Sequence, residues 1–315
     1  MLKAFWLNGL RLLLWLTKVH MKFICIVIFT FISQFSLAQS IFGKDAIIEK
    51  SLSERWELDD EDKNGTFKLT FYKPIYVLPA RWSSNPNELP QSENPDNSFT
   101  EAQNYDQVEA KFQLSLKTKL LQSFLFGHGD LWLGYTQLAN WQVYNDPVSR
   151  PFRELNYEPE VIVNFPMKIN LLGIDLRMAG FGFNHQSNGR DLPRSRSWNR
   201  LMFHAAFEKD NFQLYLKPWI RIESPDKDDN PAISDFIGRM EANFIYNLNK
   251  HSVNLIGKSS LDFDKNRGSL ELNYFYSVKS NLRLHFQAFT GYGETLIDYN
   301  HKQTTLGIGV SFIDW

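Results

Sequence analysis

The sequence predicts an all-β chain that folds as a twelve-stranded antiparallel transmembrane β-barrel. Three observations lead to this prediction. Apolar and polar residues alternate with period two in many segments of about ten residues. The connections between these segments alternate between short and long. Finally, the chain begins with an export leader, and no later apolar run approaches the ~18 residues that a transmembrane helix requires.

The alternation is clear near the C-terminus. Over 282–288, leucine, phenylalanine and alanine alternate with arginine, histidine and glutamine. A strand with this pattern puts its apolar side chains on one face and its polar side chains on the other. A soluble β-sandwich would show similar alternation. The aromatic content of 15% fits either a large soluble core or a membrane barrel in which aromatic residues face lipid, and the terminal Trp315, typical of outer-membrane barrels, favours the barrel.

We predict twelve strands, near 67–79, 109–120, 129–141, 157–167, 173–185, 199–208, 212–222, 237–247, 252–260, 268–277, 282–292 and 304–314. Connections after even-numbered strands are mostly short, as at 209–211, and those after odd-numbered strands are long, as at 186–198. Bacterial barrels alternate short periplasmic turns with long outer loops. This parity therefore puts both termini in the periplasm. The segment 83–99, rich in Ser, Asn and Pro, is expected to be a mobile outer loop.

The N-terminus has the organisation of a secretory signal peptide. Met21 starts a short n-region, Ile24 to Leu37 is apolar, and Ser36-Leu37-Ala38 fits a cleavage site after Ala38. We attribute residues 1–20, a second apolar stretch, to a start codon assigned too early; a membrane anchor formed by both stretches is the alternative. The predicted organisation is a leader (1–38), a polar N-terminal segment (39–65) and a barrel domain (66–315).

Composition excludes several classes of function. The net charge is −1 and the pI is near 6.7, so there is no electrostatic reason to expect a nucleic-acid partner. The only cysteine, Cys25, lies in the leader. The mature chain therefore cannot form a disulfide, use a thiol nucleophile or bind a metal through sulfur. The sequence contains no dinucleotide fingerprint, P-loop or metalloprotease helix motif.

The candidate catalytic groups lie within residues 181–200. His185 and Ser187 are two residues apart, so on a strand their side chains share one face, which also carries Phe181 and Phe183. On the next predicted strand, Asn199 shares its face with another apolar stripe. A His and a Ser at this spacing are common and carry little weight alone. Polar groups on a lipid-facing surface are costly unless paired, however, and a hydrogen-bonded Ser-His-Asn set is what nucleophilic acyl transfer requires.

Two consecutive motifs in this region are long and specific. They are Asn184-His185-x-Ser187-Asn188-Gly189-Arg190 and Ser195-Arg196-Ser197-Trp198-Asn199-Arg200. Together they resemble the active-site signature of the bacterial outer-membrane phospholipase A family. Further matching blocks lie at 151–159, 217–219, 228–231 and 291–300, so the resemblance extends over the predicted barrel.

The resemblance implies a twelve-stranded barrel in the outer membrane, with its active site on the outer-leaflet side. It implies that Ser187 is the nucleophile, that His185 acts as general base and then as acid, and that Asn199 orients His185. The expected activity is calcium-dependent hydrolysis of acyl esters of outer-leaflet phospholipids at either glycerol position (phospholipase A1 and A2), and of lysophospholipids.

A Ca2+ ion and a homodimer that forms in the active state are also implied by the resemblance. The oxyanion would be met by the backbone N–H of Gly189 and by water polarised by calcium. The calcium ligands would be the Arg190 carbonyl, the Ser195 carbonyl and hydroxyl, and Ser149 from the facing subunit. All are hard oxygen donors, which calcium prefers.

Two further residues match functional positions of the family. Asp229 matches a residue linked to a second calcium position, although Leu192 stands where the family has its other acidic ligand, with Asp191 beside it. Gln137 matches a glutamine that hydrogen-bonds across the dimer interface. Without the resemblance, Gln137 would be interpreted as an ordinary polar residue of the barrel interior or rim.

Two alternatives from other classes are kept. The first is a non-catalytic barrel, either a pore or an assembly scaffold, since twelve strands leave room for a water-filled lumen. Against a pore, the side chains expected to point inward carry mixed charge; they are Lys217, Arg221, Glu241, Glu271 and Arg283. The second alternative is a different outer-membrane lipid hydrolase or an acyltransferase, which analysis of the products would distinguish.

Overall fold

The computed structural model describes residues 50–312, except 126, 224–227, 263 and 280. The predicted signal peptide, the start at Met21 and the terminal Trp315 lie outside the described residues. The strands of the described part are β1 (Leu69–Phe71), β2 (Tyr76–Ser83), β3 (Val108–Leu121), β4 (Asp130–Trp141), β5 (Glu154–Leu171), β6 (Ile174–Ser187), β7 (Ser197–Lys209), β8 (Phe212–Ile222), β9 (Met240–Leu248), β10 (His251–Ser259), β11 (Gly268–Lys279), β12 (Leu282–Tyr292) and β13 (Lys302–Ser311). Its helices are α2 (Leu52–Trp56) and α3 (Ile233–Phe236), with 3-10 turns at Asp60–Asp62, Pro95–Asn97 and Asp146–Val148.

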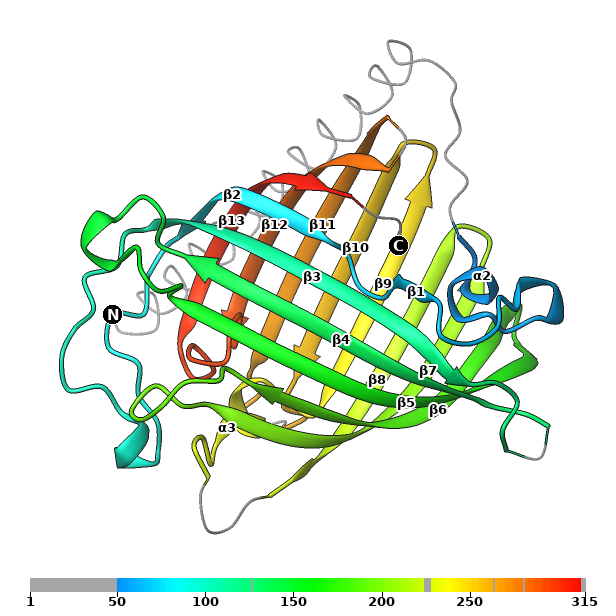
Figure 1. Cartoon of the computed structure of the whole chain (residues 1–315), viewed down its shortest axis with the longest axis horizontal. Coiled ribbons are helices and arrows are strands. Elements are labelled where there is room, and N and C mark those ends of the chain that lie inside the picture. The colour runs from blue at the N-terminus through cyan, green and yellow to red at the C-terminus, as the bar shows by residue number, and fades with distance from the viewer. Residues whose placement is uncertain (1–49, 126, 224–227, 263, 280, 313–315) are drawn as a thin grey trace, which may run out of the picture. The chain divides into compact units, whose positions relative to one another are not determined.

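Strands β2 to β13 form a closed antiparallel ring of twelve, which confirms the predicted fold class (Figure 1). Strands adjacent in the ring are adjacent in the chain, and β13 pairs with β2 to complete it. The hairpin connections β5–β6, β7–β8 and β9–β10 are short, and the connections between them are long, as the sequence predicted.

The first position of the ring is interrupted, whereas we predicted one strand over 67–79. β1 and β2 pair with successive parts of β3: Leu69 lies opposite Thr118, and Tyr76 lies opposite Gln113. Pro74 lies in the gap at residues 72–75, and proline cannot donate a hydrogen bond to a neighbouring strand. This property accounts for the break in the strand.

The outward face of the barrel is apolar and the inward face is polar. On β12, Leu284 is 53% exposed on the outside, whereas its neighbours Arg283 and His285 are each 1% exposed inside. The same division holds around the ring, because side chains alternate along each strand. The outer surface of the ring is therefore suited to contact with lipid chains.

Helix α2 closes one end of the barrel and was not predicted within the polar segment 39–65. Ser51 and Glu54 form a capping box: the Ser51 hydroxyl accepts from the Glu54 N–H at 3.1 Å, and the Glu54 carboxylate accepts from the Ser51 N–H at 2.7 Å. Leu52 and Trp56, four residues apart, share the buried face of the helix. Figure 1 shows α2 at the end of the barrel opposite α3. Of the helices in the described residues, none has the length and apolar character of a membrane span.

The long connection between β2 and β3 is held in place by hydrogen bonds, although we expected a mobile loop over 83–99. The Asn97 side chain donates to the Ser195 carbonyl at 2.9 Å, and the Arg196 guanidinium donates to the Asn97 carbonyl at 2.7 Å. The Ser92 hydroxyl donates to the Asp229 carbonyl at 2.7 Å. These bonds join three outer connections, which composition alone could not indicate.

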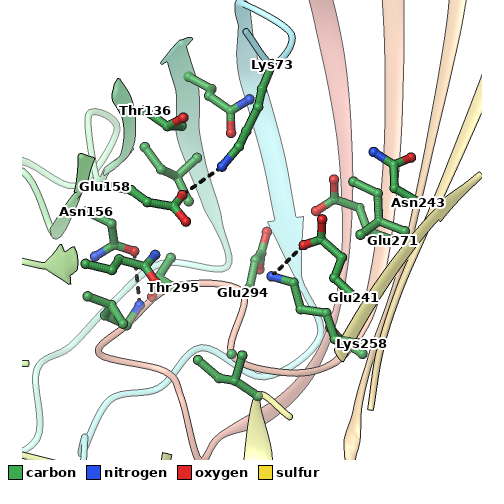
Figure 2. Close-up of a pocket in the computed structure, with 18 of the residues that line it drawn as sticks. Lys73, Thr136, Asn156, Glu158, Glu241, Asn243, Lys258, Glu271, Glu294 and Thr295 are labelled. Carbon is green, nitrogen blue, oxygen red and sulfur yellow. Dashed lines mark hydrogen bonds and ion pairs between the residues drawn. The ribbon is translucent and has the colours of Figure 1, made fainter. Parts of the chain in front are cut away.

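The lumen of the barrel is filled rather than open. Buried apolar side chains form one cluster around α2 and another beside α3 and the β12–β13 connection. Beside the second cluster lies a cavity of about 160 Å³ lined largely by acidic and basic side chains (Figure 2). Many of these charges are paired, as in Lys73–Glu158 at 2.9 Å and Lys217–Glu241 at 3.0 Å.

We predict that the purified protein, reconstituted in a planar bilayer, has no steady large channel openings. Charged side chains pair across the lumen, and α2 and the β12–β13 connection lie at its two ends, so an ion would have to displace buried ion pairs to pass. Single-channel recording at neutral pH measures this directly. Stable openings in most insertions would contradict the prediction and would favour a pore.

Glu294 is the centre of the ion-pair network at the outer end. It lies in the β12–β13 connection, and its carboxylate pairs with Arg81 and, at 2.9 Å, with Lys111. Burial raises the pKa of Glu294, but the positive charges of Arg81 and Lys111 outweigh burial and hold it well below its ordinary value. The folded pKa is therefore lower than the unfolded pKa. The stabilisation is present at pH values above the unfolded pKa and is lost as the pH falls through the folded pKa.

We predict that Glu294→Gln lowers the free energy of unfolding at pH 7 by about 3–5 kcal/mol, because it leaves two buried cations short of a counter-charge. The difference from the wild type should shrink as the pH is lowered below the ordinary carboxyl range. Urea unfolding in detergent micelles at pH 7 and pH 3 tests both points. The control is Glu61→Gln, at an exposed residue, which should have no effect. An equal loss at both pH values would contradict the account.

Candidate active site

The strand pair β6–β7 brings the predicted catalytic residues together. His185 lies opposite Asn199, and Ser187 lies opposite Ser197. His185, Ser187 and Asn199 are partly exposed, whereas their chain neighbours Asn184, Trp198 and Arg200 are buried inside the barrel. The three side chains therefore lie on the outward face, at the end where the long connections lie.

A short hydrogen bond links two of the three residues. His185 Nδ1 and Asn199 Oδ1 are 2.8 Å apart. Because an amide oxygen can only accept, Nδ1 must carry the proton. The other ring nitrogen, Nε2, is then an acceptor that can take a proton from a hydroxyl. The hydrogen bonds found among the described residues include none between Ser187 Oγ and His185. Such a bond often tightens only when substrate is bound.

The surroundings of the three residues are apolar. Phe181 and Phe183 precede His185 on the same face of β6, and each is 44% exposed. Leu201 and Phe203 follow Asn199 on β7 and are exposed on the same face. These side chains form a surface against which an acyl chain can lie beside the polar groups.

Gly189 follows the strand in a conformation that favours glycine. Its φ is +61°, and a Cβ there would lie 3.1 Å from the ring of Tyr157. Among the described residues, none accepts a hydrogen bond from the Gly189 N–H. This backbone group is close in sequence to Ser187 and is available to a developing negative charge, which is the requirement for an oxyanion donor.

Oxygen atoms cluster where the Asn188–Arg196 loop meets Asp229. The Asp229 carboxylate accepts from the Ser195 hydroxyl at 2.8 Å and from the Ser197 hydroxyl at 3.1 Å. One carboxylate and two hydroxyls are hard ligands that suit Ca2+ and do not suit a soft metal. The described residues hold no group of three or more His, Cys, Asp or Glu side chains arranged for a metal. A calcium ion here would need serine and backbone oxygens.

The remaining predicted calcium ligands already make hydrogen bonds within the chain or lie apart from Asp229. The Ser195 carbonyl already accepts from Asn97 at 2.9 Å and from Arg196 at 2.7 Å, so calcium would have to replace one of these donors. The Ser149 hydroxyl donates to the Asp146 carbonyl, and none of the hydrogen bonds found among the described residues joins Ser149 to Ser195. Asp191 is exposed, and none of the interactions found among the described residues joins it to Asp229.

Arg196 holds the outer loops together around the site. Its guanidinium donates to the carbonyls of Pro193, Ser195, Gln91 and Asn97. Burial lowers the pKa of Arg196 from its ordinary value, and nearby Tyr299 partly offsets this effect. The sequence analysis quoted Arg196 only as part of a motif. Its role as a link became visible only with the folded loops.

Gln137 lies on the outward face of β4, which excludes the alternative of a barrel-interior residue. Its side-chain oxygen accepts from the Tyr135 hydroxyl at 3.3 Å, and it lies opposite Tyr157 of β5. Tyr157 in turn lies opposite Ser187. Gln137 is therefore on the same side of the barrel as the candidate catalytic residues, two strands away.

A comparison with models of protein families shows to which family the chain belongs. The family model described as phospholipase A1 matches residues 52–312. The chain belongs to the phospholipase A1 family. It is 38% identical over 279 residues to a putative phospholipase A1 of Neisseria meningitidis serogroup B, covering 86% of this chain and 72% of that protein. It is also 38% identical over 254 residues to the phospholipase A1 of Salmonella typhimurium, covering 81% and 84%.

Solved structures of the family have the same barrel. The outer membrane phospholipase of Salmonella typhi, a dimer with bound calcium, superposes with a TM-score of 0.71 at 35% identity and covers 80% of this chain and 94% of that chain. Outer membrane phospholipase A from Escherichia coli has the same TM-score, identity and coverage. The family and the twelve-stranded barrel identify this member as a bacterial outer-membrane β-barrel, which confirms the predicted family and location.

Proposed function

We propose that this family member is a calcium-dependent phospholipase that hydrolyses acyl esters of outer-leaflet phospholipids at both glycerol positions, and of lysophospholipids. Its activity would depend on dimerisation. The observation that carries the proposal is the 2.8 Å contact between His185 and Asn199 on the lipid-facing side, in line with Ser187. An ionisable side chain on the lipid-facing wall, held in one orientation by a neighbouring amide, is by default a candidate for function.

In the proposed reaction, the Ser187 hydroxyl attacks the ester carbonyl carbon while His185 Nε2 takes its proton. The C–O bond to the glycerol then breaks, and His185 returns the proton to the leaving oxygen. Water attacks the resulting acyl-serine by the same route and releases a fatty acid. Asn199 holds the imidazole in the required tautomer. Being neutral, Asn199 stabilises the imidazolium less than an aspartate would.

Negative charge on the ester oxygen would be met by the free N–H of Gly189. Calcium, when bound, would supply additional positive charge near that oxygen. The residues proposed to hold it are Arg190 and Ser195 of one subunit with Ser149 of the other, and Asp229 at a second position. The hard oxygens of Ser195 and Asp229 support this proposal, as does the calcium in the Salmonella typhi dimer. Gln137, on the same side of the barrel, is proposed to lie in the dimer interface.

The experiment is product analysis with phospholipids that carry a different acyl chain at each glycerol position. The purified protein is assayed in mixed micelles with calcium or with a chelator. We expect release of both fatty acids, with lysophospholipid as the intermediate, only in calcium. Release of one chain alone would restrict the activity to phospholipase A1 or A2. Transfer of the chain to an acceptor lipid would indicate an acyltransferase instead.

A further inference from the structure

One buried side chain, that of Asn188, bonds to both ends of the Asn188–Arg196 loop from inside the barrel. We propose that Asn188 is a positioning residue for hydrolysis: through its side chain it sets the Gly189 N–H and the Ser195 oxygens relative to Ser187, and Glu154 holds Asn188 in turn. This inference rests on the proposed function and extends it to residues that touch neither substrate nor metal.

Asn188 and Ser187 point to opposite sides of the barrel wall. Because side chains alternate along a strand, the residue after the outward Ser187 points inward, and Asn188 is 1% exposed. A buried amide must find partners for its oxygen and its nitrogen. Asn188 finds all of them in the active-site loop and in the adjacent strand.

The hydrogen bonds of Asn188 join the two ends of the Asn188–Arg196 loop. Its side-chain oxygen accepts from the N–H groups of Arg196 at 3.0 Å and Arg190 at 3.3 Å, and its side-chain nitrogen donates to the Arg194 carbonyl at 2.7 Å. Its own backbone N–H donates to the Arg196 carbonyl at 3.0 Å. The loop between these points carries Gly189 and Ser195. Asn188 thus joins the segment that carries the oxyanion donor to the segment that carries the proposed calcium-binding oxygens, where Asn97 and Asp229 also hold Ser195.

Glu154 connects Asn188 to the interior of the barrel. Its carboxylate accepts from Asn188 Nδ2 at 3.4 Å, from Asn156 Nδ2 at 2.7 Å and from the Ile297 N–H at 3.2 Å. The Asn156 oxygen accepts from the Leu296 N–H at 3.0 Å. Glu154 is 2% exposed, and none of the salt bridges found among the described residues includes it. A buried carboxylate held only by neutral donors serves to orient those donors.

The geometry therefore links the inner β12–β13 connection to the catalytic face through the barrel wall. Ser187 and His185 belong to the strands and keep their positions without this link. The Gly189 N–H and Ser195 belong to the loop, so their positions relative to Ser187 depend on this link. Loosening the loop should slow the chemical step, because a displacement of about 1 Å in a reacting group can lower a rate about 100-fold. Acyl-chain binding on the outer wall should be unaffected.

The test uses the full-length protein, refolded in detergent micelles, with each variant normalised to its folded fraction by heat-modifiable electrophoretic mobility. We expect Asn188→Ala to lower kcat by about 10- to 100-fold, with little change in KM and a higher calcium concentration for half-maximal activity. Asn188→Asp should lose as much, because it removes the donor and puts a second carboxylate beside Glu154. Adding Glu154→Gln to Asn188→Asp should restore part of kcat, since the glutamine amide can donate to the new carboxylate.

The matched control is Asn254→Ala, at a fully buried asparagine of β10 whose side-chain atoms make none of the hydrogen bonds found in the described part of the chain. We expect this control to keep the wild-type kcat. A loss equal to that of Asn188→Ala would mean that the effect comes from general packing, and it would overturn the inference. Wild-type kcat and calcium response in Asn188→Ala would also overturn it, as would a double variant no better than Asn188→Asp. If Ser187→Ala were fully active, the proposed function itself would fail. Inactive Ser187→Ala with normal Asn188→Ala rejects this inference alone.

Discussion

Ser187→Ala is expected to lower fatty-acid release by about 10³- to 10⁶-fold, because a triad that lacks its nucleophile retains only binding and oxyanion stabilisation. The substitution removes one oxygen from the outward face of β6. It should leave the barrel intact, since none of the hydrogen bonds found among the described residues involves that hydroxyl. Calcium-dependent release from mixed micelles measures the effect, with folding checked by circular dichroism.

The control for this prediction is Ser123→Ala, in the turn between β3 and β4 at the opposite end of the barrel from the active-site loop. It should keep wild-type activity, because Ser123 is only partly buried and lies in a turn distant from β6. Ser187→Ala with activity close to the wild type would remove the nucleophile from the account. The family and the barrel would stand, and the chemistry would have to be assigned to another group.

Removing calcium is expected to have the second-largest effect, a loss of more than about 100-fold, comparable to the removal of one oxyanion donor. The reason is that the Gly189 N–H alone would then meet the charge on the ester oxygen. Titration of calcium after chelation measures the dependence, and crosslinking at each concentration measures dimer formation. Full activity in excess chelator, or from a chain that crosslinks only as a monomer, would contradict the proposal.

Asp229→Asn tests the second proposed calcium position independently of the first. It keeps the side-chain shape but removes the charge that accepts the hydroxyls of Ser195 and Ser197. We expect a higher calcium concentration for half-maximal activity with little change at saturating calcium, since Asp229 is assigned to the second position. A matched control is Asp191→Asn, at an exposed carboxylate of the active-site loop that none of the interactions found among the described residues joins to Asp229. This control should leave the calcium titration unchanged. An unchanged calcium titration in Asp229→Asn would exclude a role for this carboxylate.

The sequence predicted the barrel well because its pattern is dictated by the membrane. Every strand must alternate apolar and polar residues, so period two is repeated around the ring, and the same parity predicted that His185, Ser187 and Asn199 face outward. The strand predicted as continuous over 67–79 is divided, because Pro74 interrupts it. The capping box at Ser51 and Glu54 was present in the sequence, but it lay in a segment too polar overall to suggest a buried helix.

The parts that could not be predicted depend on contacts between distant segments. Asn188 and Glu154 are 34 residues apart, and each is unremarkable in its own segment. Their contact depends on the register of β5 against β6, and their shared environment depends on a connection at 293–301 that folds into the lumen. The same holds for Asn97 and Arg196, which join two outer connections. No local pattern encodes these pairings, because the strand twist and loop paths that create them are set by the closed ring.

The most direct test of the central claim is covalent labelling with a long-chain alkyl sulfonyl fluoride, followed by peptide mapping by mass spectrometry. We predict a single adduct on Ser187 that forms in calcium, blocks hydrolysis in proportion to labelling, and is absent from His185→Ala. Complete inhibition with the adduct on another residue, or full activity in protein labelled at Ser187, would contradict the account.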